Sequence, residues 1–412
     1  MMVPQASTPP LAEQGLMAGQ GGLADWTDLE RRLAPSGERA EPRQRAMAYR
    51  RGLLSPAERQ HSWQVAEVTG DATPSGVQHL RRRALGDPDA VRAELRRYVI
   101  QHLGDPEAVV VLDETGLLQQ GRHSAGVARQ YRGTAGHVEH CPSGVLVGYA
   151  RRLGQTWLDR ELYLPTEWTN ERERCRQAGI PEEQRVATKP QLAQQLLARA
   201  FAAGVPAPWV TGDSGYGDDR RLRLWLEAHP QASVLAVSGQ ESVGLGFQQR
   251  RVQTILAALP EDGWTRRRAG DGTKGPRWDD RPWLPLAEPL EPGWRRWLRV
   301  RRRVSTPTEV TGYVVFARHD ATLEDGVRGA GTRWTTESGF EAAKSEVGLD
   351  HCEVRSWTGW SRHITLAMWA LALLTVLRAG ASAVEAFKKS LLPPQAVSPL
   401  AAFKASRGPT FR

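Results

Sequence analysis

The sequence contains few cysteines, and none stands in a pattern that binds metal. Three occur in 412 residues, Cys141, Cys175 and Cys352, without a CxxC pair and without ligand spacing to a histidine. Isolated thiols fit a reducing compartment and argue against a disulfide framework and a structural zinc site. We therefore expect a cytoplasmic protein.

Long hydrophobic runs are also scarce. The longest is ITLAMWALALLTVL at residues 364–377, 14 residues in all, which falls short of the roughly 20 that cross a bilayer. We expect a buried helix there and no membrane partner. Residues 1–23 are polar, rich in glycine and proline, and lack the apolar segment of a secretory signal. They predict a disordered lead-in.

Positive charge is in excess. The chain has 55 Lys and Arg against 46 Asp and Glu, a formal net charge of +9, and its pI is near 9.8. This balance favours an anionic partner, with nucleic acid ahead of acidic lipid. A soluble protein that is merely basic is the alternative.

The composition divides the rest of the chain into segments. Residues 24–104 carry short helical patterns with Arg-rich faces, which suit a helical DNA-binding region, although a solvated face on a packing bundle fits equally well. Residues 105–239 alternate strand and helix patterns, and the Trp-rich residues 240–328 predict a β-rich insertion. Residues 329–380 are helical again, and residues 381–412 form a Pro-, Ala- and Lys-rich tail that we expect to be flexible.

The order of the elements predicts an α/β fold. The Val-rich strand AVVVLDETG precedes two apolar stretches that we expect to form a hairpin turning at Leu153 and Gly154. A helix follows at residues 189–205, then the strand PWVTG, another helix and the strand ASVLAVSG. With the insertion and a last helix, this order matches a ribonuclease-H-like mixed sheet flanked by helices. Residues 105–239 and 329–380 would form its two parts.

Three acidic residues lie where such a fold would bring them together. Asp113 ends the first strand, Asp213 ends the strand after the long helix, and Glu337 lies on the helix after the insertion. Functional groups of an open α/β sheet gather beyond the carboxyl ends of its strands. Carboxylates so close raise one another's pKa unless a cation binds, and Mg²⁺, or Mn²⁺ in its place, takes oxygen ligands. Two such ions about 4 Å apart can activate a water and stabilise the leaving 3′ oxygen of a phosphodiester.

Each acid also has a purely structural interpretation. Asp113 could cap a turn, and Asp213 could be an Asx-turn residue in TGDSGYG. Glu337 could pair with Arg333 on the helix surface, at a gain of only about 0.2–0.5 kcal/mol. The three acids together with the order of elements favour a metal-binding active site.

The helix RWTTESGFEAAKSEVGLD aligns Arg333, Glu337 and Lys344 on one side. With these motifs the sequence resembles the DDE transposases of bacterial insertion sequences, in the group whose third acid carries a Tyr-x2-Arg-x3-Glu-x6-Lys signature. The arginine, glutamate and lysine match, whereas Ala330 stands at the tyrosine position. WVTGDSGYG and VGLDHCEVRSWTGWSRHITLAM also resemble that family in order and spacing.

The resemblance implies a metal-dependent DNA endonuclease and strand transferase, which cleaves element ends and joins the freed 3′-hydroxyl to target DNA. Carried over by position, Asp113, Asp213 and Glu337 would be the catalytic metal ligands, and Arg333 and Lys344 would hold DNA phosphates. The expected partner is double-stranded DNA, both as terminal inverted repeats and as target. Two ends must be held together, so we expect a homodimer on DNA in the bacterial cytoplasm, associated with the nucleoid.

The stretch WRRWLRVRRRV at residues 294–304 contains six arginines. As a strand it would alternate between two faces, with Trp297, Arg299, Arg301 and Arg303 on one and Leu298, Val300 and Val304 on the other. An aromatic and arginine face suits phosphate contact and base stacking. A solvated strand face is the alternative.

Two rival functions stay open at this point. One is a catalytically inactive DNA-binding regulator derived from a transposase, which Ala330 and the unusual tail leave open. The other is a nuclease of the same fold without a strand-transfer step. A cleavage assay with a divalent metal separates them, because the regulator would bind without nicking and the nuclease would cut without joining.

Overall fold

The structure is a computed structural model of the chain. It describes residues 28, 31–32, 40–55, 62–82, 87–117, 123–132, 137–152, 154–260, 266–272, 275–280, 283–287, 291–303, 306–321 and 333–391. Only the backbone is described at residues 40–43, 82, 131–132, 137, 169, 266–272, 275–280, 303, 306–309, 333–338 and 382–391. The predicted lead-in, Ala330 and Val304 lie outside the described residues, as does the part of the predicted tail beyond Leu391.

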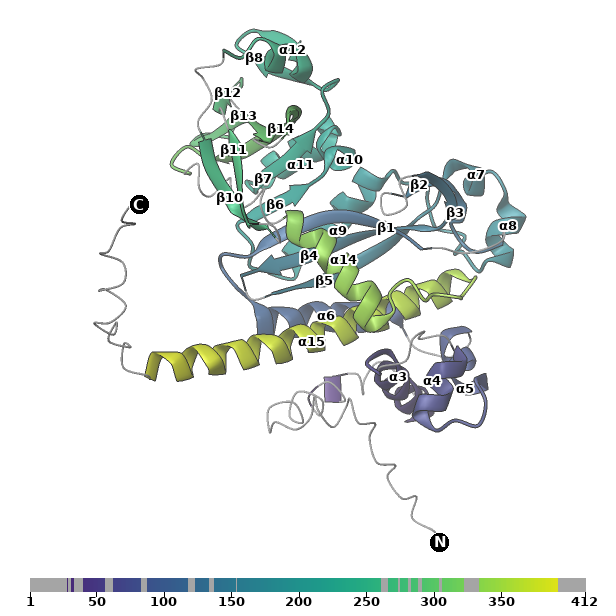
Figure 1. The fold of residues 1–412 in the computed structure, drawn as a ribbon. Coiled ribbons are helices and arrows are strands. Elements are labelled where there is room, and N and C mark those ends of the chain that lie inside the picture. Colours follow the sequence, from purple (N-terminus) through teal and green to yellow (C-terminus); the bar gives the residue numbers. More distant parts are fainter. Residues whose placement is uncertain are drawn as a thin grey trace, which may run out of the picture.

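The centre of the molecule is a mixed sheet (Figure 1). Five neighbouring strands form one end of this sheet: β1 (Val109–Gly116), β4 (Ser143–Arg151), β5 (Gly154–Tyr163), β6 (Trp209–Gly212) and β7 (Ala232–Val237). They lie in the order β5-β4-β1-β6-β7. β4 is antiparallel to β1 and to β5, whereas β6 runs parallel to β1 and to β7. Three antiparallel strands with two parallel strands added beside the first are the topology of the ribonuclease-H-like fold, so the predicted fold class is confirmed.

Local signals set the bounds of several elements. Gly154 has φ of +128° at the hairpin between β4 and β5, a conformation that glycine adopts readily. Thr188 and Gln191 each accept a hydrogen bond on the side chain from the other's backbone N–H, a capping box that starts α9 (Lys189–Ala202). Asp219 accepts from the Leu222 N–H and starts α11 (Arg220–Ala228).

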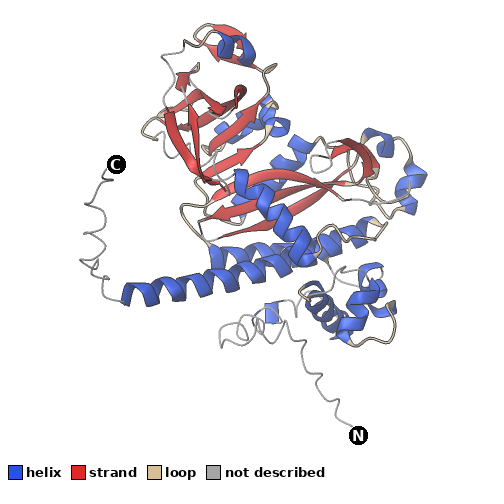
Figure 2. Ribbon diagram, in the orientation of Figure 1, coloured by secondary structure: helices blue, strands red, loops and turns tan. Residues whose placement is uncertain are grey.

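Helices cover both faces of the central sheet (Figure 2). On one face lie α9, α11 and the short α10 (Ser214–Gly217), and Lys189 of α9 pairs with Glu114 of β1. On the other lie α14 (Arg333–Val347) and α15 (Trp357–Leu391), and Phe340 of α14 packs on Trp157 of β5 with ring centroids 4.2 Å apart. The two faces of β1 are therefore covered by different sets of helices.

α15 contains the predicted apolar helix and extends beyond it at both ends. Its segment Trp357–Ala381 is long and apolar enough to cross a membrane by length and composition, and 67% of an apolar 18-residue stretch within it is buried inside the protein. Trp360 and Trp369 are among the largest fully buried side chains. A core helix passes the same length and composition test, and its burial supports the prediction of a buried helix.

The first described helices pack beside α15. They are α3 (Ala40–Leu53), α4 (Ser62–Thr69), α5 (Ser75–Arg82) and α6 (Pro88–Leu103). His363 of α15 is fully buried and lies 2.7 Å from the Tyr49 hydroxyl at Nδ1 and 3.2 Å from the Leu349 carbonyl at Nε2. Arg81 of α5 is also buried, and it donates to the Ser62 hydroxyl. Arg81 therefore packs inside the helical region and lies on neither a DNA-facing nor a solvated face.

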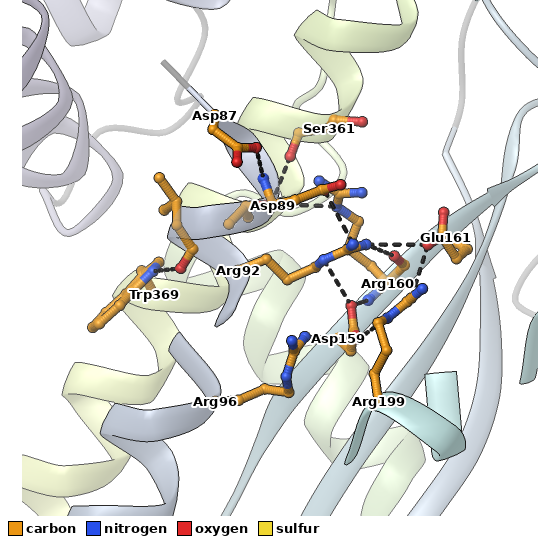
Figure 3. Close-up of polar contacts among 12 residues, drawn as sticks. Asp87, Asp89, Arg92, Arg96, Asp159, Arg160, Glu161, Arg199, Ser361 and Trp369 are labelled. Carbon is orange, nitrogen blue, oxygen red and sulfur yellow. Dashed lines mark hydrogen bonds and ion pairs between the residues drawn. The ribbon is translucent and has the colours of Figure 1, made fainter. Parts of the chain in front are cut away.

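α6 joins this helical region to the central sheet (Figure 3). Asp159 of β5 is fully buried and pairs with three guanidinium groups. The distances are 3.3 Å to Arg92 Nε, 2.9 Å to Arg96 Nη1 and 2.8 Å to Arg199 Nε. Arg92 and Arg199 also pair with Glu161. We call these five residues the Asp159 cluster; it ties α6, β5 and α9 together.

The remaining strands lie at two places. Between β1 and α9 the chain adds β2 (Ala128–Arg132), β3 (His137–Cys141), α7 (Thr166–Thr169) and α8 (Arg172–Gln177). After β7 come β8 (Ser242–Leu245), β9 (Gln248–Arg251), α12 (Val252–Ala257), β10 (Arg266–Gly272), β11 (Gly275–Asp280), β12 (Trp283–Pro285), β13 (Trp294–Arg303) and β14 (Thr306–Arg318). The region is rich in strands, and because β14 pairs with β7 it continues the central sheet.

Candidate active site

Parallel pairing brings two of the predicted acids together. Leu112 of β1 is the register partner of Gly212 of β6, and Asp113 and Asp213 are the next residues of the two strands. Adjacent strands lie about 4.8 Å apart. The two aspartates therefore stand side by side where the parallel pairing of β1 with β6 ends. β6 ends at Gly212 as predicted, whereas β1 continues to Gly116, so the prediction that Asp113 ends its strand is wrong. The last residues of β1 still pair with β4.

Strand alternation puts both aspartates on the face that α14 covers. Val109, Val111 and Trp209 belong to one apolar cluster. A Cβ at Gly148 would lie 3.6 Å from Val111 and 3.1 Å from the Trp157 ring, on which Phe340 of α14 packs, so this is the face of α14. Successive side chains of a strand point to opposite faces, so the side chain of Asp113 lies on the same face as that of Val111, two residues earlier. The backbone of Asp213 is still extended, with φ of −81° and ψ of −174°. The side chain of Asp213 therefore lies on the same face as that of Trp209, four residues earlier.

Both carboxylates are held by backbone N–H groups. Asp113 Oδ1 accepts from the Glu114 N–H at 2.7 Å. Asp213 caps α10, and its Oδ1 accepts from the Gly215 N–H at 2.9 Å. The Asp213 Oδ2 atom accepts no hydrogen bond from the part of the chain that the structure describes. That oxygen is available to a ligand.

A buried hydroxyl lies next to the acids. Tyr216 of α10 is fully buried. Burial raises the pKa of Tyr216 well above its usual value, and the negative charges of Glu114, Asp113 and Asp213 raise it further. All three carboxylates thus act on one phenol, which agrees with their clustering at this edge.

Glu114 belongs to the opposite face of β1. Its Oε1 atom lies 2.5 Å from Lys189 Nζ, and the Lys189 ammonium is 5.5 Å from the centre of the Tyr163 ring. Glu114 is therefore neutralised by a lysine on the α9 side. This leaves Asp113 as the acid of β1 that faces α14.

The sequence had not singled out Glu114, Lys189 or Tyr216. Glu114 follows Asp113 directly, and strand alternation alone predicts that the two acids face opposite sides of the sheet. Lys189 is at the start of a helix predicted from the sequence, but its pairing with Glu114 depends on tertiary packing. Tyr216 stands three residues after Asp213 in TGDSGYG, a segment in which the sequence assigned a role to Asp213 alone.

α14 lies across β1, β4 and β5 (Figure 1). Phe340 and Ala343 are buried, and Gly339 lies so close to Gln155 that a Cβ would come within 2.3 Å of its Nε2. The Lys344 ammonium lies 5.7 Å from the centre of the Phe340 ring. Because residues three and four apart share a helix face, Glu337 has a position on the same face as Phe340 and Lys344. Only the backbone of Arg333 and Glu337 is described.

The donor set fits a divalent metal ion. Asp113 and Asp213 supply carboxylate oxygens at adjacent positions, and Mg²⁺ needs few protein oxygens because it keeps several waters. No group of three His, Cys, Asp or Glu side chains that could hold a metal occurs among the described residues, and the Glu337 side chain is not one of them. The predicted third ligand therefore stays a prediction.

The arginine-rich strand β13 has the predicted alternation. Leu298 and Val300 are buried in one apolar cluster, and Trp297 packs in another, on the opposite face. Arg299, on the Trp297 face, is 1% exposed and lies 5.2 Å from the centre of the Tyr313 ring. This burial weighs against a direct contact of Arg299 with DNA in this conformation.

The other residues of that face differ in exposure. Trp297 is partly buried and packs edge-on against Trp283, with centroids 5.5 Å apart. Arg301 is also partly buried and lies 3.4 Å from the Tyr313 hydroxyl. Arg303 is described by its backbone alone. Their contact with DNA stays a prediction.

Comparisons with known proteins identify the family of the chain. A profile of the DDE superfamily endonucleases matches residues 32–276, a stretch that contains Asp113 and Asp213 but ends before Glu337. The probable transposase for insertion sequence element IS701 from Microchaete diplosiphon is 24% identical over 306 residues, which cover 72% of this chain and 73% of the relative. These similarities confirm the resemblance to DDE transposases of insertion sequences. The chain belongs to the DDE superfamily of endonucleases.

Proposed function

We propose that the chain is a transposase that binds insertion-sequence ends, cleaves DNA by two-metal phosphodiester hydrolysis and joins the 3′-hydroxyl ends to target DNA. The observation that carries the proposal is the parallel register of Leu112 with Gly212, which sets Asp113 and Asp213 side by side. Membership of the DDE superfamily and similarity to a probable transposase support it.

The proposed cofactor is Mg²⁺, for which Mn²⁺ would substitute. Bound divalent ions lower the pKa of an attacking water and stabilise the leaving 3′ oxygen. Asp113 and Asp213 would be ligands, with Glu337 of α14 as the third. Asp213 is preorganised for this role, because its hydrogen bond to Gly215 fixes one oxygen.

The proposed partner is double-stranded DNA, both as terminal inverted repeats and as target. Arg333 and Lys344 would hold phosphates beside the site, because their positions on α14 are aligned with Glu337. On β13, Trp297, Arg301 and Arg303 are further candidates, whereas Arg299 would have to leave its packing on Tyr313. Two ends must be held at once, so we propose a homodimer on DNA in the bacterial cytoplasm, at the nucleoid.

The test is cleavage of DNA that carries the inverted repeats flanking the gene. We expect Asp113→Asn, Asp213→Asn and Glu337→Gln each to reduce cleavage by about 100-fold or more, because even the hydrogen-bond partners of metal ligands are commonly worth 10- to 100-fold. Binding to the ends should stay nearly intact. Asp320→Asn, at a largely exposed aspartate that pairs with Arg318, is the matched control.

The same assay distinguishes the rival functions. Wild-type protein that binds the ends without nicking them in Mg²⁺ or Mn²⁺ would be a DNA-binding regulator. Protein that nicks but never joins a 3′ end to target DNA would be a nuclease without strand transfer. Cleavage at the wild-type rate by any one of the three variants would remove that residue from the site.

A further inference from the structure

Lys189 is the first residue of α9, a position where a positive charge is unfavourable. Thr188 caps this helix, and the first turn contains no acidic residue. The helix dipole favours anions at this end and disfavours cations. A lysine that opposes the local preference of its own helix points to a contact outside that helix.

The contact is an ion pair with Glu114 of β1. Lys189 Nζ lies 2.5 Å from Glu114 Oε1, and the two side chains are 26% and 32% exposed. The ammonium also lies 5.5 Å from the centre of the Tyr163 ring. The capping box of Thr188 and Gln191 fixes the start of the helix. The lysine is therefore held at a defined place on the α9 side of the sheet.

Glu114 connects this ion pair to the candidate metal ligand beside it. The Glu114 N–H donates to Asp113 Oδ1 at 2.7 Å. The last pair between β1 and β6 joins Leu112 to Gly212, and beyond it β1 pairs with β4. The end of β1 that carries both acids thus has a strand neighbour on one side, and Lys189 supports it from α9.

The carboxylate of Glu114 also lies near the start of α10. A Cβ at Gly212 would come within 3.4 Å of the Tyr216 Cβ and 3.3 Å of the Leu112 Cβ, and Leu112 and Glu114 share one face of β1. After burial, the charge of Glu114 contributes most to the raised pKa of Tyr216. A carboxylate left unpaired above a buried phenol is costly. Without Lys189, Glu114 would turn toward water and shift the backbone N–H that Asp113 accepts from.

We propose that Lys189 is a positioning residue of the metal site: it holds Glu114 and, through the Glu114 N–H, orients the carboxylate of Asp113 from the opposite face of the sheet. This inference rests on the proposed function, because it assumes that Asp113 binds a divalent ion. Groups that hold metal ligands in place are commonly worth about 10- to 100-fold in metal affinity or activity. Lys189 itself touches neither the metal nor DNA.

The experiment is calorimetric titration of the full-length protein with Mn²⁺, comparing wild type with Lys189→Met. Methionine keeps most of the apolar stem of the side chain and removes the ammonium. We expect Mn²⁺ to bind about 10- to 100-fold more weakly, and half-maximal cleavage of end DNA to need more Mn²⁺ by the same factor. The direction is decisive, because a lysine that acted only through its charge would repel Mn²⁺, and its loss would tighten binding.

Two further measurements separate positioning from folding and from DNA contact. Lys189→Gln keeps an N–H donor for Glu114 and should lose less affinity than Lys189→Met. If Lys189→Met does not fold, wild-type Mn²⁺ affinity in Lys189→Gln overturns the inference. The log–log salt slope of binding to end DNA should stay unchanged, because Lys189 lies on the face opposite Asp113; a slope lower by about 1 would mean that Lys189 contacts a phosphate, and would overturn the inference.

The control is another partly buried ion pair, between Arg296 of β13 and Glu227 of α11. Arg296 Nε lies 2.7 Å from Glu227 Oε1, and the side chains are 22% and 11% exposed. Arg296→Met should lower the free energy of unfolding and leave Mn²⁺ affinity unchanged. Equal weakening of Mn²⁺ binding in Arg296→Met and Lys189→Met would reflect a general loss of stability and overturn the inference.

The outcomes also separate this inference from the proposed function. Wild-type protein that binds Mn²⁺ and cuts end DNA, while Lys189→Met binds Mn²⁺ as tightly or more tightly, would overturn the inference alone. Wild-type protein that binds no Mn²⁺ and does not cut would contradict the proposed function as well.

Discussion

The Asp159 cluster allows a stability prediction with a defined size (Figure 3). The change is Asp159→Asn, which keeps the volume of the side chain and removes its charge. Asp159 is fully buried and lies within 3.3 Å of atoms of Arg92, Arg96 and Arg199. Loss of its charge leaves these guanidinium groups facing one another with Glu161 as the remaining acid of the cluster.

The pKa shifts of two arginines, Arg199 and Arg160, reflect the positive charge that is concentrated at the Asp159 cluster. Burial alone would lower the pKa of Arg199, but Asp159 and Glu161 outweigh burial and raise that pKa. Burial, and then repulsion from Arg92, lower the pKa of the neighbouring Arg160 to about 10. Breaking a buried ion pair by removing one partner typically costs about 3–5 kcal/mol. We expect Asp159→Asn to lower the free energy of unfolding by that amount.

The assay is urea unfolding followed by both Trp fluorescence and circular dichroism, because a free energy is defined only where the two transitions coincide. The control is Asp320→Asn. Its pair with Arg318 has side chains 60% and 64% exposed, and an exposed pair is worth only about 0–1 kcal/mol. A loss below about 1 kcal/mol for Asp159→Asn, equal to that of the control, would refute the reasoning that the cluster holds α6 on the sheet.

Two further predictions concern pH and salt. Burial, and then the charge of Arg81, lower the pKa of His363 to about 3. His363 takes up a proton near pH 6.5 in the unfolded chain but not in the folded chain. The free energy of unfolding should therefore fall as the pH drops from 6.5 toward 3. From pH 7.5 to pH 5 the free energy of unfolding, measured with urea, should fall by about 2 kcal/mol, and His363→Gln should abolish this fall. An equal pH dependence in His363→Gln would contradict the assignment of the pH dependence to His363. Lys344→Ala should weaken binding to end DNA and reduce its log–log salt slope by about 1, and an unchanged slope would mean that Lys344 touches no phosphate.

Much of the central fold could be predicted because its signals are local. The Val-rich β1, the glycine turn at Gly154 and the capping residues Thr188 and Asp219 each leave a pattern within a few residues. The order of strands and helices then limits the topology. The same order predicted Asp113 and Asp213 at strand ends, which holds for Asp213 but not for Asp113, because β1 continues to Gly116. The parallel register still brings the two acids together.

Tertiary contacts explain what the sequence could not show. Arg299 stands in an alternating pattern that fits a DNA-facing strand, yet it is buried against Tyr313 because β14 packs beside it. Likewise, arginines recur along α5 and α6, and only the contacts of Arg81 and Arg92 with partners distant in sequence show that these two side chains pack inside the protein. The DNA-binding role of the helical region stays a prediction. Charge patterns alone do not specify the partner.

Metal binding tests the central claim, that Asp113 and Asp213 share one divalent-cation site, most directly. The measurement is calorimetric titration of the full-length protein with Mn²⁺, comparing wild type with Asp113→Asn, Asp213→Asn and the control Asp320→Asn. The account predicts that either active-site substitution weakens Mn²⁺ binding strongly, while the control leaves it unchanged. Wild-type Mn²⁺ affinity in either active-site variant would contradict the shared site.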